Sequence, residues 1–358
     1  MKEWLWQLGY SRWRAAPPAP LEGYTVLINI PGDLPLFLDI AVEVLRQQDP
    51  THFVEALVIP DKITPEIREG YAKAVKRWPE GRLRFVVLPA VDRMITGFLN
   101  NPSHNHWLQI IRGIEASRTT HALIHDADLF LIDPQFLRKL YDKCEREKLA
   151  CVGISPVWDK WFHQQGLTAL AATWELMVDN AWFRSFKPWE HHGHRGECCG
   201  QSHIFDTTLL PQTKTPPERI ARLENLPFVH FNYVISTYRS FQKAQGPFED
   251  SYYRLLLIRL LHDAYGSSHC KVPPFEILLK GCEDFTLPVI YKDATHFPEF
   301  RRKMQELMDS KLLSAPQVEM LQTRLNKIEE AMMGSLNQVE QDESDESDRM
   351  KVDRRLDG

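Results

Sequence analysis

The chain has 358 residues, of which 43% are hydrophobic and 25% are charged. This composition is ordinary for a globular protein of one large or two smaller domains. No run of about 18 or more apolar residues occurs, so no transmembrane segment is expected. The net charge is −5, and the eight acids and four bases after Ser335 account for −4 of it. The rest of the chain is close to neutral, so nucleic acid is not an expected partner.

Residues 1–21 are predicted to be a tryptophan-rich segment followed by a linker. Trp4, Trp6 and Trp13 stand near leucines, and residues 15–20 read Ala-Ala-Pro-Pro-Ala-Pro, a stiff connection. The tryptophans are expected to pack against the body of the protein, and a peripheral membrane contact is the alternative. The segment lacks the apolar core of a signal peptide, and the six cysteines show no disulfide spacing. These features predict a cytoplasmic protein.

Strands and helices alternate through the first 135 residues. Buried strands are predicted at 24–30, 53–59, 83–88 and 120–132, with helices between them. This alternation is typical of a parallel sheet wrapped by helices. Further on, the sequence predicts a helix at 136–148, strands at 150–154 and 228–233, a helix at 249–265, and two short helices within 298–334.

Two carboxylates close the fourth predicted strand, in His125-Asp126-Ala127-Asp128. Asp126 and Asp128 can hold a hard divalent cation, which prefers oxygen ligands. The alternative is that they cap the next turn, since Asp is common where strands end. Ligands of parallel α/β sheets gather at the carboxyl ends of the strands. The same edge should carry Asp61 and the segment from Asn29 to Asp33, and this shared position favours a site.

Several motifs resemble, in order, those of glycosyltransferases of the GT-A fold. A polar loop follows the first strand, and a helix with Asn105, Gly113 and Ala116 precedes Asp126-x-Asp128, as in that superfamily. Further on, Phe248-Glu249-Asp250 resembles the x-Glu-Asp motif. Ala294-Thr295-His296-Phe297 stands where many members place a metal-binding histidine.

The resemblance implies an α/β, Rossmann-like GT-A fold: a mixed central sheet flanked by helices, with further helices at the C-terminus. It covers about residues 22–300, with a donor-binding half at 22–135 and an acceptor half at 136–300. C-terminal helices at 301–334 and a disordered acidic tail at 335–358 complete the predicted organisation.

The resemblance also implies a function. The chain is expected to be a metal-dependent glycosyltransferase of the hexosyltransferase type (EC 2.4). It would move a sugar from a UDP- or GDP-sugar to a hydroxyl of a glycan, lipid or small-molecule acceptor, with Mn²⁺ or Mg²⁺ as cofactor. The predicted metal ligands are Asp126 and Asp128, with His296 or His230 as a third; the predicted donor contacts are Asn29, Ile30, Asp33, Asp61, Asn105, Asp126 and Ala127.

The predicted base is Asp250, with Glu249 as second choice. A carboxylate near the acceptor can take the proton of its hydroxyl, which fits an inverting reaction. An acid at a helix start also benefits from the helix dipole. The alternative is that both acids only cap that helix.

Two other functions stay open. A nucleotidyltransferase or metal-dependent phosphohydrolase would use the same acidic edge, but residues 30–35 lack the glycine-rich basic loop of nucleotidyltransferases. The stretch 191–203 holds four histidines and two cysteines and could be a non-catalytic zinc-binding module. Its adjacent His-His and Cys-Cys pairs are not typical zinc spacings, which favours an acceptor-side loop. Residues 174–180 are a further candidate for an acceptor wall.

Overall fold

The computed structural model describes residues 3–14, 19–244, 252–267, 269–283 and 297–331. The chain forms two compact units, Met1–Ile235 and Ser236–Gly358. Their boundary falls inside 22–300, the range predicted as a single domain.

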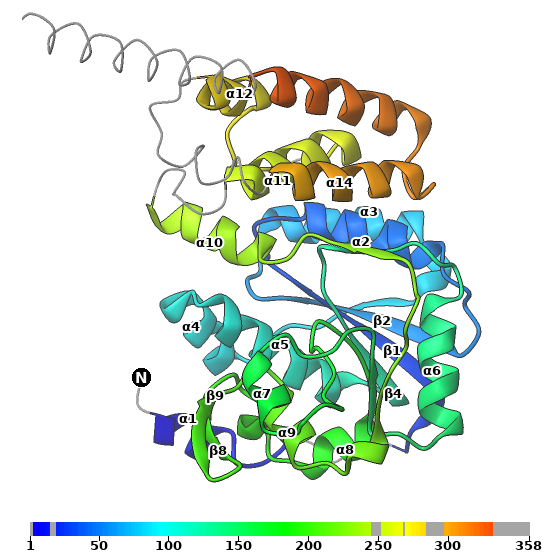
Figure 1. The fold of residues 1–358 in the computed structure, drawn as a ribbon, viewed down its shortest axis with the longest axis vertical. Coiled ribbons are helices and arrows are strands. Elements are labelled where there is room, and N and C mark those ends of the chain that lie inside the picture. Colours follow the sequence, from blue (N-terminus) through cyan, green and yellow to red (C-terminus); the bar gives the residue numbers. More distant parts are fainter. Residues whose placement is uncertain (1–2, 15–18, 245–251, 268, 284–296, 332–358) are drawn as a thin grey trace, which may run out of the picture. The chain divides into compact units, whose positions relative to one another are not determined.

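A seven-stranded sheet forms the centre of the first unit (Figure 1). Its strand order is β10-β6-β7-β4-β1-β2-β3. The central strand β1 pairs in parallel with β2 and β4, whereas β7 runs antiparallel to β4 and β6. The sheet is therefore mixed. Its strands are β1 Leu21–Ile30, β2 Phe53–Pro60, β3 Leu83–Phe85, β4 Thr119–His125, β6 Cys151–Gly153, β7 Glu175–Asp179 and β10 Ile220–Arg222.

Two short antiparallel pairs lie outside this sheet. Strand β5 (Leu129–Leu131) pairs with β11 (Phe228–His230), and β8 (Arg195–Cys198) forms a hairpin with β9 (Gln201–Ile204). The predicted strand 120–132 is thus two strands, because the chain turns at Asp126–Asp128 before it continues as β5.

Helices cover both faces of the sheet (Figure 1). Helix α5 packs on the face that presents Leu27, Leu57 and Ile124, while α2 and α6 contact strands from the other side. The helices of this unit are α1 Glu3–Gly9, α2 Leu36–Arg46, α3 Pro65–Arg77, α4 Ala90–Leu99, α5 Pro102–Ala116, α6 Phe136–Arg146, α7 Lys160–Gln164, α8 Asn180–Ser185 and α9 Leu209–Thr213, with 3-10 turns η1 Pro79–Gly81, η2 Pro188–His191 and η3 Pro217–Arg219.

Gly113 explains how closely α5 approaches the sheet. A Cβ at this position would lie 2.7 Å from the Ile59 side chain and 2.9 Å from the Leu27 side chain. Any larger residue would push α5 away from β1 and β2, because close-packed interiors leave no room to absorb it. The glycine therefore fixes the helix that carries Asn105 and His106.

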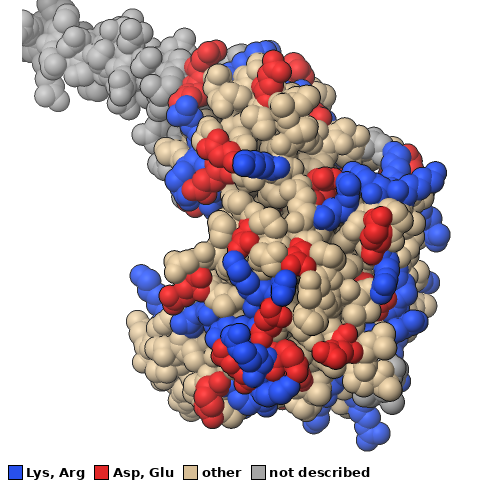
Figure 2. All heavy atoms as spheres, turned by 90° about the vertical axis from the view of Figure 1, so that its right-hand side faces the viewer, with Lys and Arg blue, Asp and Glu red and all other residues tan. Residues whose placement is uncertain are grey.

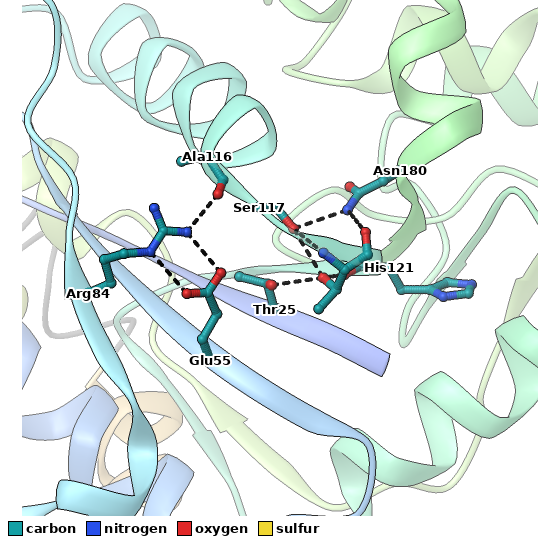
Figure 3. Close-up of polar contacts among 8 residues, drawn as sticks. Thr25, Glu55, Arg84, Ala116, Ser117, His121 and Asn180 are labelled. Carbon is teal, nitrogen blue, oxygen red and sulfur yellow. Dashed lines mark hydrogen bonds and ion pairs between the residues drawn. The ribbon is translucent and has the colours of Figure 1, made fainter. Parts of the chain in front are cut away.

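A polar network ties down the amino-terminal edge of the sheet (Figure 3). Arg84 donates to both carboxylate oxygens of Glu55, at 3.0 and 2.8 Å, and to the Ala116 carbonyl at the end of α5. The Asn180 amide donates to Ser117 Oγ and to the Thr119 carbonyl. These bonds anchor the end of α5 and the start of β4, so the other ends of both elements reach the opposite edge of the sheet.

The second unit is helical in its described residues. Tyr252 Oη donates to the Leu278 carbonyl at 2.6 Å and joins α11 to α12. Asp263 pairs with Arg324 and joins α11 to the helix at 315–331. The helices are α10 Val234–Ala244, which begins before the unit boundary, α11 Tyr252–Tyr265, α12 Phe275–Glu283, α14 Phe297–Asp309 and 315–331.

The predicted fold class is confirmed: an α/β protein with a mixed central sheet flanked by helices and with helices at its C-terminal end. Trp6 of the N-terminal segment packs as expected, since it is buried against Trp107. Residues 174–180, a candidate acceptor wall, instead include β7 of the central sheet. None of the described helices is long and apolar enough to cross a membrane.

Charges of both signs are interspersed on the face of the first unit that carries α6 (Figure 2). Lys143 pairs with Glu147 at 2.8 Å, and Arg138 with Asp49 at 3.0 Å. Neighbouring opposite charges neutralise one another and leave no broad basic field on this face.

Candidate metal site at the carboxyl ends of the strands

Asp126, Asp128 and His230 each bring a ligand atom within 4.8 Å of the other two. His230 Nε2 lies 3.5 Å from Asp128 Oδ1 and 3.8 Å from Asp126 Oδ2. Asp126 directly follows β4 and Asp128 directly precedes β5. His230 arrives from far along the chain because β11 pairs with β5 and sets it opposite Leu129.

The backbone around these side chains is held by specific bonds. The Asp126 N–H donates to the Trp174 carbonyl at 3.1 Å, which joins the end of β4 to the start of β7. After β11, Asn232 and Tyr233 both adopt left-handed backbone with φ 58°. Asparagine accepts this conformation more readily than most residues. The turn brings the Val234 N–H to the Asp128 carboxylate.

The two carboxylates have opposite electrostatic environments. Burial, together with the nearby charges of Asp128, Glu175 and Asp206, raises the pKa of Asp126 well above its usual value. Burial also acts to raise the pKa of Asp128, but His230 and backbone N–H donors outweigh it and leave that pKa below the usual value. A group of acids this crowded is stabilised by a bound cation, which offsets the repulsion between them.

The donor set fits a divalent ion. Two carboxylates and one imidazole suit Mn²⁺ or Mg²⁺ and leave coordination positions for a substrate. Around them, buried polar atoms make no hydrogen bond within the described part of the chain: both side-chain atoms of Asn29, Asn105 Oδ1, His106 Nε2, His125 Nε2, Trp174 Nε1 and Glu175 Oε1. Buried polar groups are normally satisfied, so this set marks a place where a ligand can supply partners.

The predicted donor-contact residues lie together at this edge. Paired positions Ile30↔Pro60 and Ile28↔His125 bring the ends of β1, β2 and β4 side by side. Asn29 and Ile30 close β1, Asp33 lies in the loop before α2, and Ala127 separates the two acids.

Asp61 is engaged in holding this edge together. Its Oδ1 accepts from the Gly32 N–H at 2.9 Å, and its Oδ2 accepts from the Asn105 amide at 2.8 Å. Gly32 is required at this point because a Cβ would lie 1.9 Å from the Lys62 carbonyl oxygen. Asp61 and Asn105 therefore connect the loop after β1 to the start of α5.

Sequence reasoning missed three residues at the site. His106 Nε2 lies 3.8 Å from Asp126 Oδ1, and burial lowers the pKa of His106. His125 Nδ1 lies 2.9 Å from Glu175 Oε2, and both side chains are fully buried. Burial raises the pKa of Glu175. His106 follows the predicted Asn105 directly. Glu175 lies in the stretch 174–180 that was a candidate acceptor wall, and only the pairing of β4 with β7 places it opposite His125.

Three predicted residues, Asp250, Glu249 and His296, lie outside the described residues. Their roles stay predictions. His230, which the sequence left as an alternative to His296, is the histidine that joins the two acids in the described part of the chain.

The stretch 191–203 does not assemble a zinc site. His191 stacks on Phe183 with ring centroids 3.6 Å apart, and His203 contacts Asp159 at 2.7 Å. Cys198 and Cys199 sit at the turn of the β8–β9 hairpin. Among the described residues, no three ligands of this stretch converge. The described residues therefore give the zinc-module alternative no support, because His191 packs on Phe183 and His203 contacts Asp159.

Fold and site together define an α/β protein with a candidate divalent-cation site where parallel strands end. No model of a protein family matches the sequence, and no curated protein sequence matches it.

Similar solved structures exist at low sequence identity. One is a mannosyltransferase from Pyrobaculum calidifontis in complex with GDP-Man and Mn²⁺, at 13% identity over 93% of each chain, with a TM-score of 0.38. Another is glucosyl-3-phosphoglycerate synthase from Mycobacterium tuberculosis in complex with Mn²⁺ and UDP-glucose, at 10% identity over 69% of this chain and 85% of that one, with a TM-score of 0.39. Similarity this remote does not define a function for this chain.

Proposed function

We propose that this chain is a metal-dependent glycosyltransferase that takes its sugar from a nucleotide-sugar donor. The observation that supports it most is the meeting of Asp126, Asp128 and His230 at the carboxyl ends of β4, β5 and β11. In parallel α/β sheets this edge is where ligands bind. The motif order noted in the sequence points to the same chemistry.

Different residues of the site would bind the metal ion and the nucleotide-sugar donor. Asp126, Asp128 and His230 would hold Mn²⁺ or Mg²⁺, which supplies positive charge to the leaving diphosphate. Asn29 and Asn105 would contact the nucleoside part of the donor, because their side chains keep buried polar atoms without a partner among the described residues. The Trp174 ring, 4.3 Å from the His230 ring, shields one side of the metal ligands from water.

The acceptor hydroxyl must lose a proton during transfer. A carboxylate within hydrogen-bond reach can accept it. Asp250 stays the proposed base, with Glu249 as second choice. With a carboxylate as base, we propose an inverting reaction of the hexosyltransferase type. The donor is proposed to be a UDP- or GDP-sugar, the acceptor a glycan, lipid or small-molecule hydroxyl, and the location cytoplasmic.

The test is a thermal-shift panel of nucleoside diphosphates and nucleotide sugars, with and without Mn²⁺. A ligand that binds only the folded chain stabilises it by about 2.7 kcal/mol at 100 times its Kd. The matching donor should raise the melting temperature only with metal, and this shift should vanish in Asp128→Asn but persist in Cys198→Ser. The proposal fails if no nucleotide stabilises the wild-type protein in a metal-dependent way. Metal-dependent hydrolysis of simple phosphate esters, without a response to nucleotide sugars, would favour the phosphohydrolase instead.

A further inference from the structure

A pocket lies in the first unit, among α1, the first turn of α5 and the chain around η2 and β8. Its volume is about 230 Å³. Helix α1 contributes the indole of Trp6, and α5 contributes His104. The residues used below are Trp6, His104, Trp189, His192, His194 and Arg195.

Two histidines of this pocket are joined by a hydrogen bond. His192 Nε2 lies 2.6 Å from His104 Nδ1, so one of these nitrogens donates to the other. In the neutral pair, one of the two remaining ring nitrogens then carries an N–H and the other a lone pair, whichever way the shared proton sits. A further proton turns both outer nitrogens into donors. The pair can therefore donate hydrogen bonds to a ligand, and it donates two instead of one when it is protonated.

The surroundings of the pair favour its neutral form. Burial lowers the pKa of His192 to about 3, with further lowering by His104 and His194. Burial lowers the pKa of His104 as well. The His192 ring is enclosed by Trp6, 5.7 Å away and nearly parallel, and by the edge of Trp107 at 4.6 Å. An anion in the pocket would favour the protonated pair, because an opposite charge nearby stabilises the charged form.

The remaining surroundings are positive or neutral. Arg195 is exposed at the rim, and His194 Nδ1 donates to the His192 carbonyl. His104 lies in the first turn of the 15-residue helix α5, whose N-terminus carries partial positive charge. Of the described residues that line the pocket, none is acidic. The nearby Glu190 is already paired with Lys214 at 2.6 Å.

We propose that this pocket binds an oxyanion: the phosphate group of a small phosphorylated molecule, or inorganic phosphate. Arg195 and the histidine pair would donate to its oxygens, and Trp6 and Trp189 would line the apolar wall beside it. The volume suits a group of a few heavy atoms rather than a whole nucleotide sugar. The site is separate from Asp126, Asp128 and His230 and does not depend on the function proposed for them.

The test is a calorimetric titration of the full chain with sulfate at pH 6 and pH 8. Sulfate keeps its charge over this range, so a pH effect must come from the protein. We expect saturable binding to one site, several-fold tighter at pH 6 because the anion favours proton uptake by the pair. Arg195→Gln should weaken binding roughly tenfold, equivalent to about 1.4 kcal/mol. His194→Gln should weaken it less, and Arg146→Gln, a matched exposed control, should not change it.

Further arms separate the sources of the ligand and the rival sites. Inorganic phosphate and glycerol phosphate compared at one pH show whether the ester or the free ion binds better. Asp128→Asn should bind sulfate as tightly as the wild type, so a failure of the glycosyltransferase proposal leaves this result unaffected. The oxyanion proposal is overturned by the absence of saturable sulfate binding to the folded protein. It is equally overturned if Arg195→Gln binds unchanged, or if stoichiometric Zn²⁺ occupies the histidine pair and sulfate does not bind.

Discussion

Two regions of this protein carry metal-ligand residue types, and among the described residues only one of them brings three such side chains together. The stretch 191–203 is the richer of the two in sequence, with four histidines and two cysteines. His191 and His203 of this stretch nevertheless face separate partners, whereas Asp126, Asp128 and His230 converge. The difference is one of topology. Strand pairing brings His230 to the two acids, while ring stacking draws His191 into the core. Local density of ligand types is therefore a weaker signal than a shared sheet edge.

The largest expected effect, on metal binding and on sugar transfer, comes from removing the negative charge of Asp128. Asp128→Asn keeps the shape of the side chain but loses a carboxylate ligand. We expect Mn²⁺ affinity to fall at least a hundredfold and sugar transfer about a thousandfold, equivalent to about 4 kcal/mol of transition-state stabilisation. Calorimetric Mn²⁺ titration and initial rates with the donor found in the thermal-shift panel measure both. Unchanged Mn²⁺ binding would move the metal site away from Asp128.

The next effect concerns the core histidine of the other region. Burial lowers the pKa of His191 to about 3 from its usual 6.5. As the pH falls below 6.5, His191 is therefore protonated in the unfolded chain but not in the folded chain. The free energy of unfolding decreases as the pH falls from 6.5 toward 3. At pH 5 the loss from this residue is about 2 kcal/mol.

His191→Phe should remove that loss, because a phenyl ring keeps the stack on Phe183 and does not titrate. The measurement is urea unfolding at pH 7 and pH 5 for both proteins. The wild type should lose about 2 kcal/mol more than the variant between the two values. His52→Gln, at a half-exposed site, is the control and should follow the wild type. An identical pH dependence in His191→Phe would place the responsible group elsewhere.

A smaller effect tests the third ligand. His230→Gln should weaken Mn²⁺ binding roughly tenfold, about 1.4 kcal/mol, since two carboxylates remain. His203→Gln is the matched control in the other region, where the imidazole contacts Asp159 and stacks on Trp161. Its Mn²⁺ affinity should equal that of the wild type. If both variants bind alike, His230 is a packing residue and another group completes the site.

The smallest expected effect is that of the cysteine pair. Cys198 Sγ and Cys199 Sγ lie 3.7 Å apart at a hairpin turn. In the double variant Cys198→Ser and Cys199→Ser, Mn²⁺ affinity and bound zinc should stay within about twofold of the wild type. Substitutions at partly exposed positions such as these usually have small effects. Stoichiometric zinc that disappears in this variant would restore the zinc-binding alternative.

The sequence by itself determined the elements and the edge at which they meet. Alternating apolar strands and helices with clear start signals, such as the Thr64 hydroxyl that accepts from the Ile67 N–H, are local features. Residues that follow parallel strands share an edge by geometry alone, so Asp61 and Asp126 were predictable neighbours. Only the tertiary structure showed that, among the described residues, His230 joins the two acids and that Glu175 lies opposite His125. It also decided that His191 and His203 of the stretch 191–203 pack against aromatic rings. Those outcomes depend on antiparallel pairings and ring contacts between residues far apart in the chain, and no local pattern encodes such contacts.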